Sequence, residues 1–144
     1  MGTALALLRL YRRSGLQALT RSLGVLRGFP RLRAMDALLG DVPRAAPLPE
    51  VVPAVGPKRG RVGLLTGCVQ RHLYPVVNQD TARLLALAGW DVVVPTAQEC
   101  CGALDVHAGR LDEFRARALA LSRAFPSDVD YVVSNAAGCG SAMR

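Results

Sequence analysis

RVGLLT, residues 61–66, is a short and nearly continuous apolar run that ends at a glycine, Gly67. Two further runs of this kind follow it, DVVVP at residues 91–95 and YVVS at residues 131–134. Short apolar runs bounded by turn residues are typical of strands that are buried on both faces of a sheet. The second half of the chain is therefore predicted to contain three buried strands.

Helical patterns fill the two intervals between these strands. In the first interval, Pro75 suits an initial helical turn, and Gly89 suits the left-handed position that follows a helix. In the second, apolar residues recur at helical spacing from Leu111 to Phe125, with Asp112 at the positive end. Alternation of strands and helices predicts an α/β fold, a three-layer Rossmann-like parallel sheet with flanking helices.

The first 60 residues have a different composition. Residues 1–35 contain seven arginines and no acidic residue, so the formal charge of +7 belongs to this segment. Interspersed leucines predict a basic helical arm over residues 1–40, with weak points at Gly15 and Gly24. Five prolines between residues 41 and 60 predict a linker, and residues 61–144 would then form the α/β domain.

The composition also excludes several classes of protein. No apolar run approaches the roughly 20 residues of a membrane-spanning helix. Two of the four cysteines are adjacent, which disfavours a disulfide scaffold and favours a reducing, intracellular setting. The basic arm is open to three interpretations: a solvated interdomain helix, a surface for acidic partners or anionic lipid, or a transit-like presequence. Nucleic-acid binding is not expected, since the arm offers no aromatic stacking platform.

Each cysteine follows one of the predicted strands: Cys68 the first, Cys100 and Cys101 the second, and Cys139 the third. Parallel strands end at the same edge of a sheet, so we expect the four side chains to lie together. Helix starts at this edge would lower the pKa of the thiols. Four cysteines suggest an iron-sulfur cluster or a structural zinc site, and their spacing does not choose between these. A redox-active dithiol at the adjacent pair, or plain burial of each cysteine in the core, would explain the pattern less fully.

Other polar and aromatic residues near these loops have simpler interpretations. His107 would hydrogen-bond a sulfur or cap local backbone. Glu99 and Asp105 are expected to be solvated, since they form no recognisable acid–base pair. Trp90 and Tyr131 are expected to pack at the strand starts, away from the cysteines.

Three segments also carry a resemblance: GCVQ at 67–70, ECCGALDVHAG at 99–109 and NAAGCGSAM at 135–143. They resemble the cysteine-rich CCG domain, which is related to the CCG-containing component of heterodisulfide reductases, and more narrowly the first such domain in the iron-sulfur subunits of glycolate oxidases. The resemblance implies that the four cysteines bind an iron-sulfur cluster, of 4Fe-4S type, with structural zinc as the alternative.

The resemblance also implies a cellular role. The cluster would relay electrons toward a membrane acceptor from an FAD-containing subunit that oxidises glycolate to glyoxylate. The expected location is the cytoplasm, with peripheral contact at the inner face of the cell membrane. Such a subunit would assist the enzyme without carrying out the oxidation itself.

Two features depart from the family pattern. Ala142 stands where the full CCG motif has the second cysteine of a final C-x-x-C, which leaves the cluster type open. The ferredoxin-like module and the second CCG domain of such subunits are absent from this sequence. The chain is therefore expected to be a fragment, truncated at its C-terminus and inactive alone.

Overall fold

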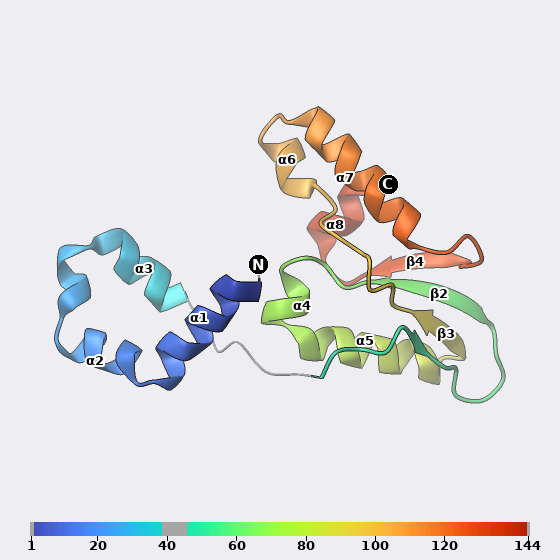
Figure 1. Ribbon diagram of the computed structural model, residues 1–144. Helices are drawn as coiled ribbons and strands as arrows, with labels where there is room; N and C mark the ends of the chain where they lie inside the picture. Colours follow the sequence, from blue (N-terminus) through green and yellow to red (C-terminus); the bar gives the residue numbers. More distant parts are fainter. Residues whose placement is uncertain (1, 39–45, 144) are drawn as a thin grey trace. The chain divides into compact units, whose positions relative to one another are not determined.

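The computed structural model describes residues 2–38 and 46–143. The chain divides into two compact units, Met1–Val42 and Pro43–Arg144, each with its own internal packing (Figure 1).

The first unit is helical throughout its described part. It consists of α1 (Gly2–Arg13), α2 (Leu16–Ser22), the short 3-10 helix η1 (Val25–Gly28) and α3 (Pro30–Leu38). Gly15 and Gly24 lie between successive helices with φ angles of 76° and 66°. Only glycine adopts this left-handed backbone at little cost, so both residues end a helix where the sequence predicts a weak point.

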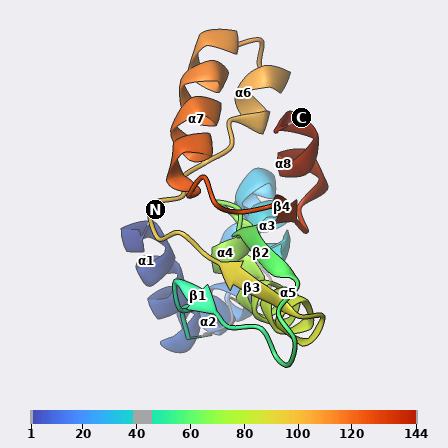
Figure 2. The same cartoon turned by 90° about the vertical axis from the view of Figure 1, so that its right-hand side faces the viewer.

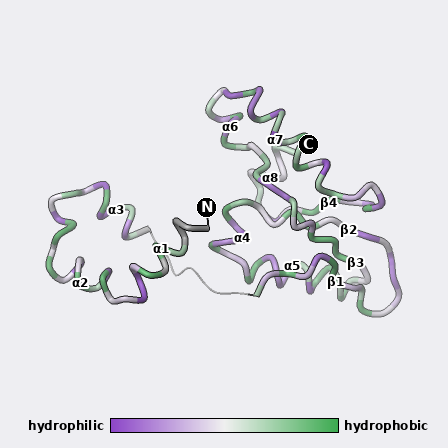
Figure 3. The backbone as a smooth tube through the Cα atoms, viewed as in Figure 1, coloured by the Kyte–Doolittle hydropathy of each residue, from purple (hydrophilic) through white to green (hydrophobic). Residues whose placement is uncertain are grey.

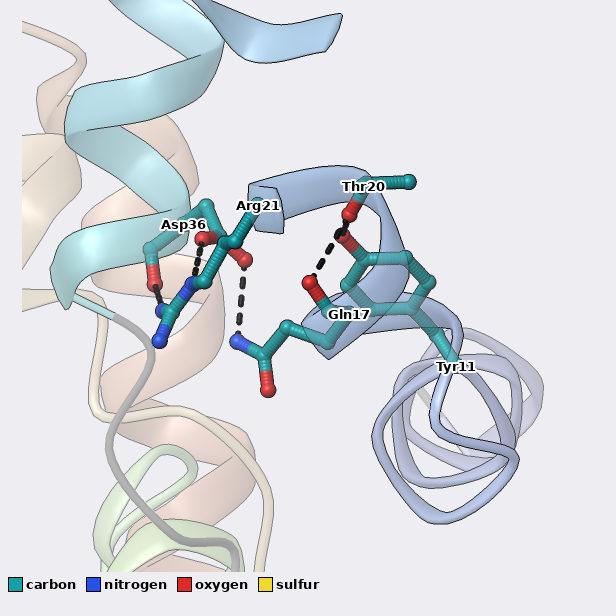
Figure 4. A network of polar contacts seen from close by, with 5 residues as sticks. All are labelled: Tyr11, Gln17, Thr20, Arg21 and Asp36. Atoms are coloured by element: carbon teal, nitrogen blue, oxygen red, sulfur yellow. Dashed lines mark hydrogen bonds and ion pairs between the residues drawn. The ribbon is translucent and has the colours of Figure 1, made fainter. Parts of the chain in front are cut away.

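A buried carboxylate joins the helices of this unit (Figure 4). Asp36 of α3 accepts a hydrogen bond of 2.9 Å from Nε2 of Gln17 and one of 2.6 Å from Nε of Arg21, both on α2. The Gln17 hydrogen bond and the Arg21 guanidinium hold the pKa of Asp36 below its usual value. Tyr11 and Thr20 share a second contact of 2.8 Å between their hydroxyl groups, which joins α1 to α2.

The second unit contains a four-stranded sheet in the order β1-β3-β2-β4. Its strands are β1 (Val51–Val52), β2 (Gly60–Leu65), β3 (Trp90–Val93) and β4 (Tyr131–Ser134). β2 pairs in parallel with both β3 and β4, and β1 adds an antiparallel edge to β3.

Helices cover both faces of this sheet (Figures 1 and 2). On one face lie α4 (Gln70–Leu73) and α5 (Pro75–Leu87); on the other lie α6 (Ala103–His107), α7 (Leu111–Ala124) and α8 (Ala137–Ala142). The predicted α/β fold with a largely parallel sheet is confirmed.

Alternate residues of β2 face opposite layers, because successive side chains of a strand point to opposite sides. Val62 and Leu64 pack against the α5 layer, where Ala82 and Ala86 are also buried. Leu65 packs on the other side, against Leu121 of α7. The trace of α5 alternates between hydrophobic and hydrophilic segments, as expected for a helix with one buried face (Figure 3).

The structure adds details that the sequence did not predict. Within the predicted linker, Val51 and Val52 form β1, and an edge strand of this length tolerates the surrounding prolines. The part of that prediction covering residues 41–45 lies outside the described residues.

Trp90 and Tyr131 meet edge to face at the strand starts, with ring centroids 5.8 Å apart, as predicted. Among the described helices, none is long and apolar enough to cross a membrane.

Candidate metal centre

All four cysteines line one cavity of about 320 Å³ at the carboxyl edge of the sheet. The Sγ atoms of Cys68 and Cys100 are 3.4 Å apart. Cys101 is buried, and Cys139 packs against the hydrophobic cluster that contains it. None of the four forms a disulfide. The predicted convergence of the cysteines is therefore present in the folded chain.

The strand order explains this convergence. β2 lies between β3 and β4, and the helices that follow β2 and β4 lie on opposite faces of the sheet. The loops after β2 and β4 therefore diverge and leave a crevice, which is where open α/β sheets commonly bind ligands. Cys68 comes from the loop after β2, Cys139 from α8 after β4, and the adjacent pair from the segment between β3 and α6.

The remaining lining of this cavity is mostly apolar. Val69, Tyr74 and Leu104 are exposed at its rim, and the lining residues that the structure describes include no Asp, Glu, Lys or Arg. The described lining therefore adds no negative charge that would repel an anionic thiolate cluster. An apolar lining also limits the access of water, which raises the strength of electrostatic interactions inside.

Gly102 shapes the loop that carries the adjacent cysteines. Its φ angle is 78°, and a Cβ atom built on it would lie 3.2 Å from Cα of Phe114. Glycine therefore allows this loop to pack closely against α7. The Gly102 N–H donates to Sγ of Cys100 at 3.5 Å, a main-chain contact of the kind that stabilises metal-bound thiolates.

Two of the thiols, those of Cys68 and Cys139, have raised pKa values in this arrangement. Burial, followed by the neighbouring thiols, raises the pKa of Cys139 to about 12, and the same causes raise the pKa of Cys68. The sequence-based expectation of lowered pKa values is wrong for these two residues, because burial and then the neighbouring thiols disfavour the charged thiolate. A bound cationic metal would reverse this preference, since metal ligation requires thiolates.

The site does not match the pattern for a single bound metal ion. Over residues 2–38 and 46–143, no group of three or more His, Cys, Asp or Glu side chains is arranged to hold one ion. The four thiols instead line one cavity of about 320 Å³.

The other polar residues near the cavity have structural positions. His107 is exposed at the end of α6 and does not line the cavity. Glu99 is exposed, as expected. The expectation that Asp105 is solvated is wrong: it is buried and ion-paired with Arg110 and with Arg117, the latter at 2.9 Å, which fixes the turn between α6 and α7.

Sequence reasoning also missed two buried amides beside the cysteine loops, Asn78 and Gln98. Asn78 could have been noticed, because it lies four and eight residues before the buried Ala82 and Ala86, on the buried face of α5. Gln98 lies in an irregular segment, where no periodic pattern marks a buried position.

Comparison with known protein families gives two matches that together cover most of the chain. The model of the cysteine-rich domain, CCG, matches residues 62–144, the segment that holds all four cysteines. The chain belongs to the cysteine-rich domain family. The model of the linker region of the glycolate oxidase iron-sulfur subunit matches residues 1–39, a range that includes α1, α2, η1 and α3.

Relatives of this cysteine-rich domain protein include an iron-sulfur subunit. It is 42% identical over 146 residues to the probable glycolate oxidase iron-sulfur subunit of Bacillus subtilis, a match that covers 98% of this chain and 33% of the relative. It is 32% identical over 94 residues to a fumarate reductase (CoM/CoB) subunit of Methanothermobacter marburgensis, covering 65% of this chain and 19% of that protein.

A third relative is lactate utilization protein A of Geobacillus thermodenitrificans, which is 30% identical over 84 residues, 58% of this chain and 35% of the relative. The chain thus spans about a third or less of the length of these relatives. No solved structure matches it significantly. The comparisons confirm the resemblance to the CCG domain and to glycolate oxidase iron-sulfur subunits.

Proposed function

We propose that the chain is part of an iron-sulfur electron-transfer subunit of a glycolate dehydrogenase, and that Cys68, Cys100, Cys101 and Cys139 bind its cluster, of 4Fe-4S type. The observation that carries this proposal is the convergence of all four cysteines on one largely apolar cavity. The matches to the CCG domain and to the glycolate oxidase linker region support the same assignment.

A bound iron-sulfur cluster supplies one-electron transfer, and the chain's own residues position and shield it. Four thiolates would hold the metal atoms, the Gly102 N–H would donate to a ligand sulfur, and the apolar rim would limit contact with water. The described cavity lining has no carboxylate or histidine to abstract a proton. Oxidation of glycolate to glyoxylate is accordingly assigned to an FAD-containing partner subunit.

Further partners complete the proposed electron path. Electrons would continue to a membrane acceptor, with the complex bound peripherally at the inner face of the cell membrane. The helical arm carries the excess of basic charge, and such charge is attracted to anionic lipid or acidic protein surfaces.

A zinc-stabilised interaction module is the alternative, because four thiolates are the number that a structural zinc site uses. Two observations favour the cluster. The cysteine side chains in the described part of the chain are not arranged around a single ion, and Cys100 and Cys101 are adjacent, whereas zinc ligands usually have residues between them.

Anaerobic reconstitution of the chain with iron and sulfide tests this assignment. We expect a broad visible absorption band, an EPR signal after reduction, and matching amounts of iron and sulfide. Replacing Cys139 with serine is expected to abolish or strongly weaken cluster binding. Ser141→Ala is the matched control, because Ser141 is exposed on the same helix and does not line the cavity.

Two results would count against the cluster. One is stoichiometric zinc without iron or sulfide after anaerobic preparation, which would favour the interaction module. The other is a chain that folds but forms no chromophore under these conditions.

A further inference from the structure

Two buried side-chain amides lie between the three segments that carry the cysteines. Gln98 is 3% exposed and precedes Cys100 by two residues; Asn78 is 2% exposed and lies in the first turns of α5. We call Gln98 and Asn78 the clamp amides. Both bind the main chain of Thr66, which precedes Cys68 by two residues.

Gln98 continues the parallel sheet past its last strand pair. The pairing of β2 with β3 ends at Gly63 and Val93. Beyond it, the Thr66 N–H donates to Oε1 of Gln98 at 2.9 Å, and Nε2 of Gln98 donates to the Leu64 carbonyl at 3.2 Å. A neighbouring parallel strand would bind these same two main-chain groups through one residue, and the amide supplies the same donor and acceptor.

A guanidinium reinforces this connection. Nη2 of Arg71 donates to the main-chain carbonyl of Gln98 at 2.9 Å, and its Nε donates to the carbonyl of Gly67 at 3.1 Å. Gly67 is the residue before Cys68. The loop with Cys68 and the segment with Cys100 and Cys101 are therefore joined on two sides.

Asn78 joins the Cys68 loop to the third segment. Its Nδ2 donates to the Thr66 carbonyl at 2.9 Å, and its Oδ1 accepts from Nδ2 of Asn135 at 3.2 Å. Asn135 directly follows β4 and also donates to Oγ1 of Thr81 at 2.9 Å. Asn135 lies just before α8, which carries Cys139. Its hydrogen bond to Asn78 therefore connects α8 to the loop that carries Cys68.

We infer that the clamp amides are positioning residues, which hold the three cysteine segments at a fixed spacing before any cofactor binds. The inference rests on the proposed function of the four cysteines as ligands. Both main-chain groups of Thr66 are committed, one to each clamp amide, and each clamp amide leads to a different cysteine segment. Burying an amide costs free energy unless it is fully hydrogen-bonded. The presence of two such amides between the cysteine segments therefore fits a role in positioning these segments.

The test measures the spacing of the thiols in the metal-free chain. Under a mild thiol oxidant such as diamide, Cys68 and Cys100 should form a disulfide rapidly, because their sulfur atoms are only 3.4 Å apart. Gln98→Met keeps the length of the side chain and removes both hydrogen bonds. We expect it to slow this disulfide about tenfold or more, since each lost hydrogen bond shifts the local equilibrium several-fold.

Two control variants separate positioning from simple loss of stability. Gln79→Met removes a neighbouring amide that binds the Ala46 carbonyl at 2.7 Å and not the main chain of Thr66. Val92→Ala truncates a fully buried residue in the core on the α5 side. Both should form the disulfide within about twofold of the parent rate. An unchanged rate in Gln98→Met, or an equal slowing in Val92→Ala, would overturn the inference.

The same variants are then loaded with iron and sulfide, and retention of iron is followed against a chelator. Loss of a group that orients metal ligands typically weakens affinity by about 10- to 100-fold, and we expect this for Gln98→Met. If the parent binds no iron but Gln98→Met still slows the disulfide, the proposed function fails and the positioning role stands. If the parent retains iron and Gln98→Met matches it in both assays, the positioning role fails alone.

A measurement on the unaltered chain covers the case in which Gln98→Met does not fold. Hydrogen exchange of the Thr66 N–H reports its bond to Gln98 directly. We expect protection comparable to the amides of β2. Exchange as fast as that of an exposed loop would show that the clamp is not formed.

Discussion

Substituting Gly63, in the middle of β2, tests the packing between the sheet and the α7 layer. A Cβ atom on this residue would lie 2.6 Å and 2.9 Å from two ring carbons of Phe125, which follows α7 directly. Ordinary contact begins near 3.4 Å, so the ring or the strand must move by about 0.8 Å. Overpacking of this kind costs about 1–3 kcal/mol, and alanine recovers about 0.5–1 kcal/mol through its lower entropy in the unfolded chain.

We therefore expect Gly63→Ala to lower the free energy of unfolding by about 1–2 kcal/mol, as measured by urea denaturation followed by circular dichroism. In a Phe125→Leu background the loss should largely disappear, because the smaller side chain leaves room for the methyl group. Gly140→Ala is the matched control: its Cβ would meet only Cβ of Ser134 at 3.9 Å, and its place within α8 favours alanine. An equal loss from Gly63→Ala with and without Phe125 would refute the steric argument.

Two further outcomes are expected elsewhere in the chain. Leu121→Ala removes a fully buried side chain from the core beside Cys101 and should lower the free energy of unfolding by about 2–5 kcal/mol in the same assay; a loss below about 1 kcal/mol would show that this core is not formed. Hydrogen bonds from Gln17 and Arg21 lower the pKa of Asp36. The Asp36 carboxylate therefore contributes its full stabilisation of the folded chain above the ordinary pKa of 3.8, and this contribution is lost as the pH falls through the lowered pKa. NMR titration of the Gln17 side-chain amide should show this step, and Asp36→Asn should lack it.

The three parallel strands β2, β3 and β4 and the two long helices of the second unit could be predicted from the sequence because each carries a strong local signal. The continuous apolar run of β2 and the Pro75 and Gly89 signals around α5 are examples. The short helices α4, α6 and α8 have no such signal, since helices of a few residues are stabilised by their surroundings and not by their own sequence. β1 was missed because its prolines indicate a linker, and its pairing with β3 is visible only in three dimensions.

The convergence of the cysteines on one cavity could be predicted from the sequence, but the pKa values and the hydrogen bonds around the cavity could not. The position of each cysteine after a parallel strand was enough to place Cys68 near Cys100. The raised pKa of Cys68 depends on burial and on neighbouring thiols, which the order of residues does not reveal. Gln98 was missed because its partners, Thr66 and Leu64, are main-chain groups distant in sequence, and no residue type marks a main-chain partner.

The parallel pairing of β4 with β2 has a consequence for the order in which the chain folds. β2, α5 and β3 are consecutive, whereas the β4 side of β2 is completed by residues such as Asp130, which lies 69 residues after Arg61. Pairing β2 with β4 closes a longer stretch of chain than pairing β2 with β3, and closing a longer stretch costs more entropy. We therefore expect the β2–α5–β3 segment to form first. Pulsed alkylation during refolding should then show Cys139 protected last. A nascent chain would thus hold Cys68 and Cys100 side by side before Cys139 has folded into place. In that interval the chain is most susceptible to oxidation, which would join Cys68 and Cys100 in a disulfide and block metal loading.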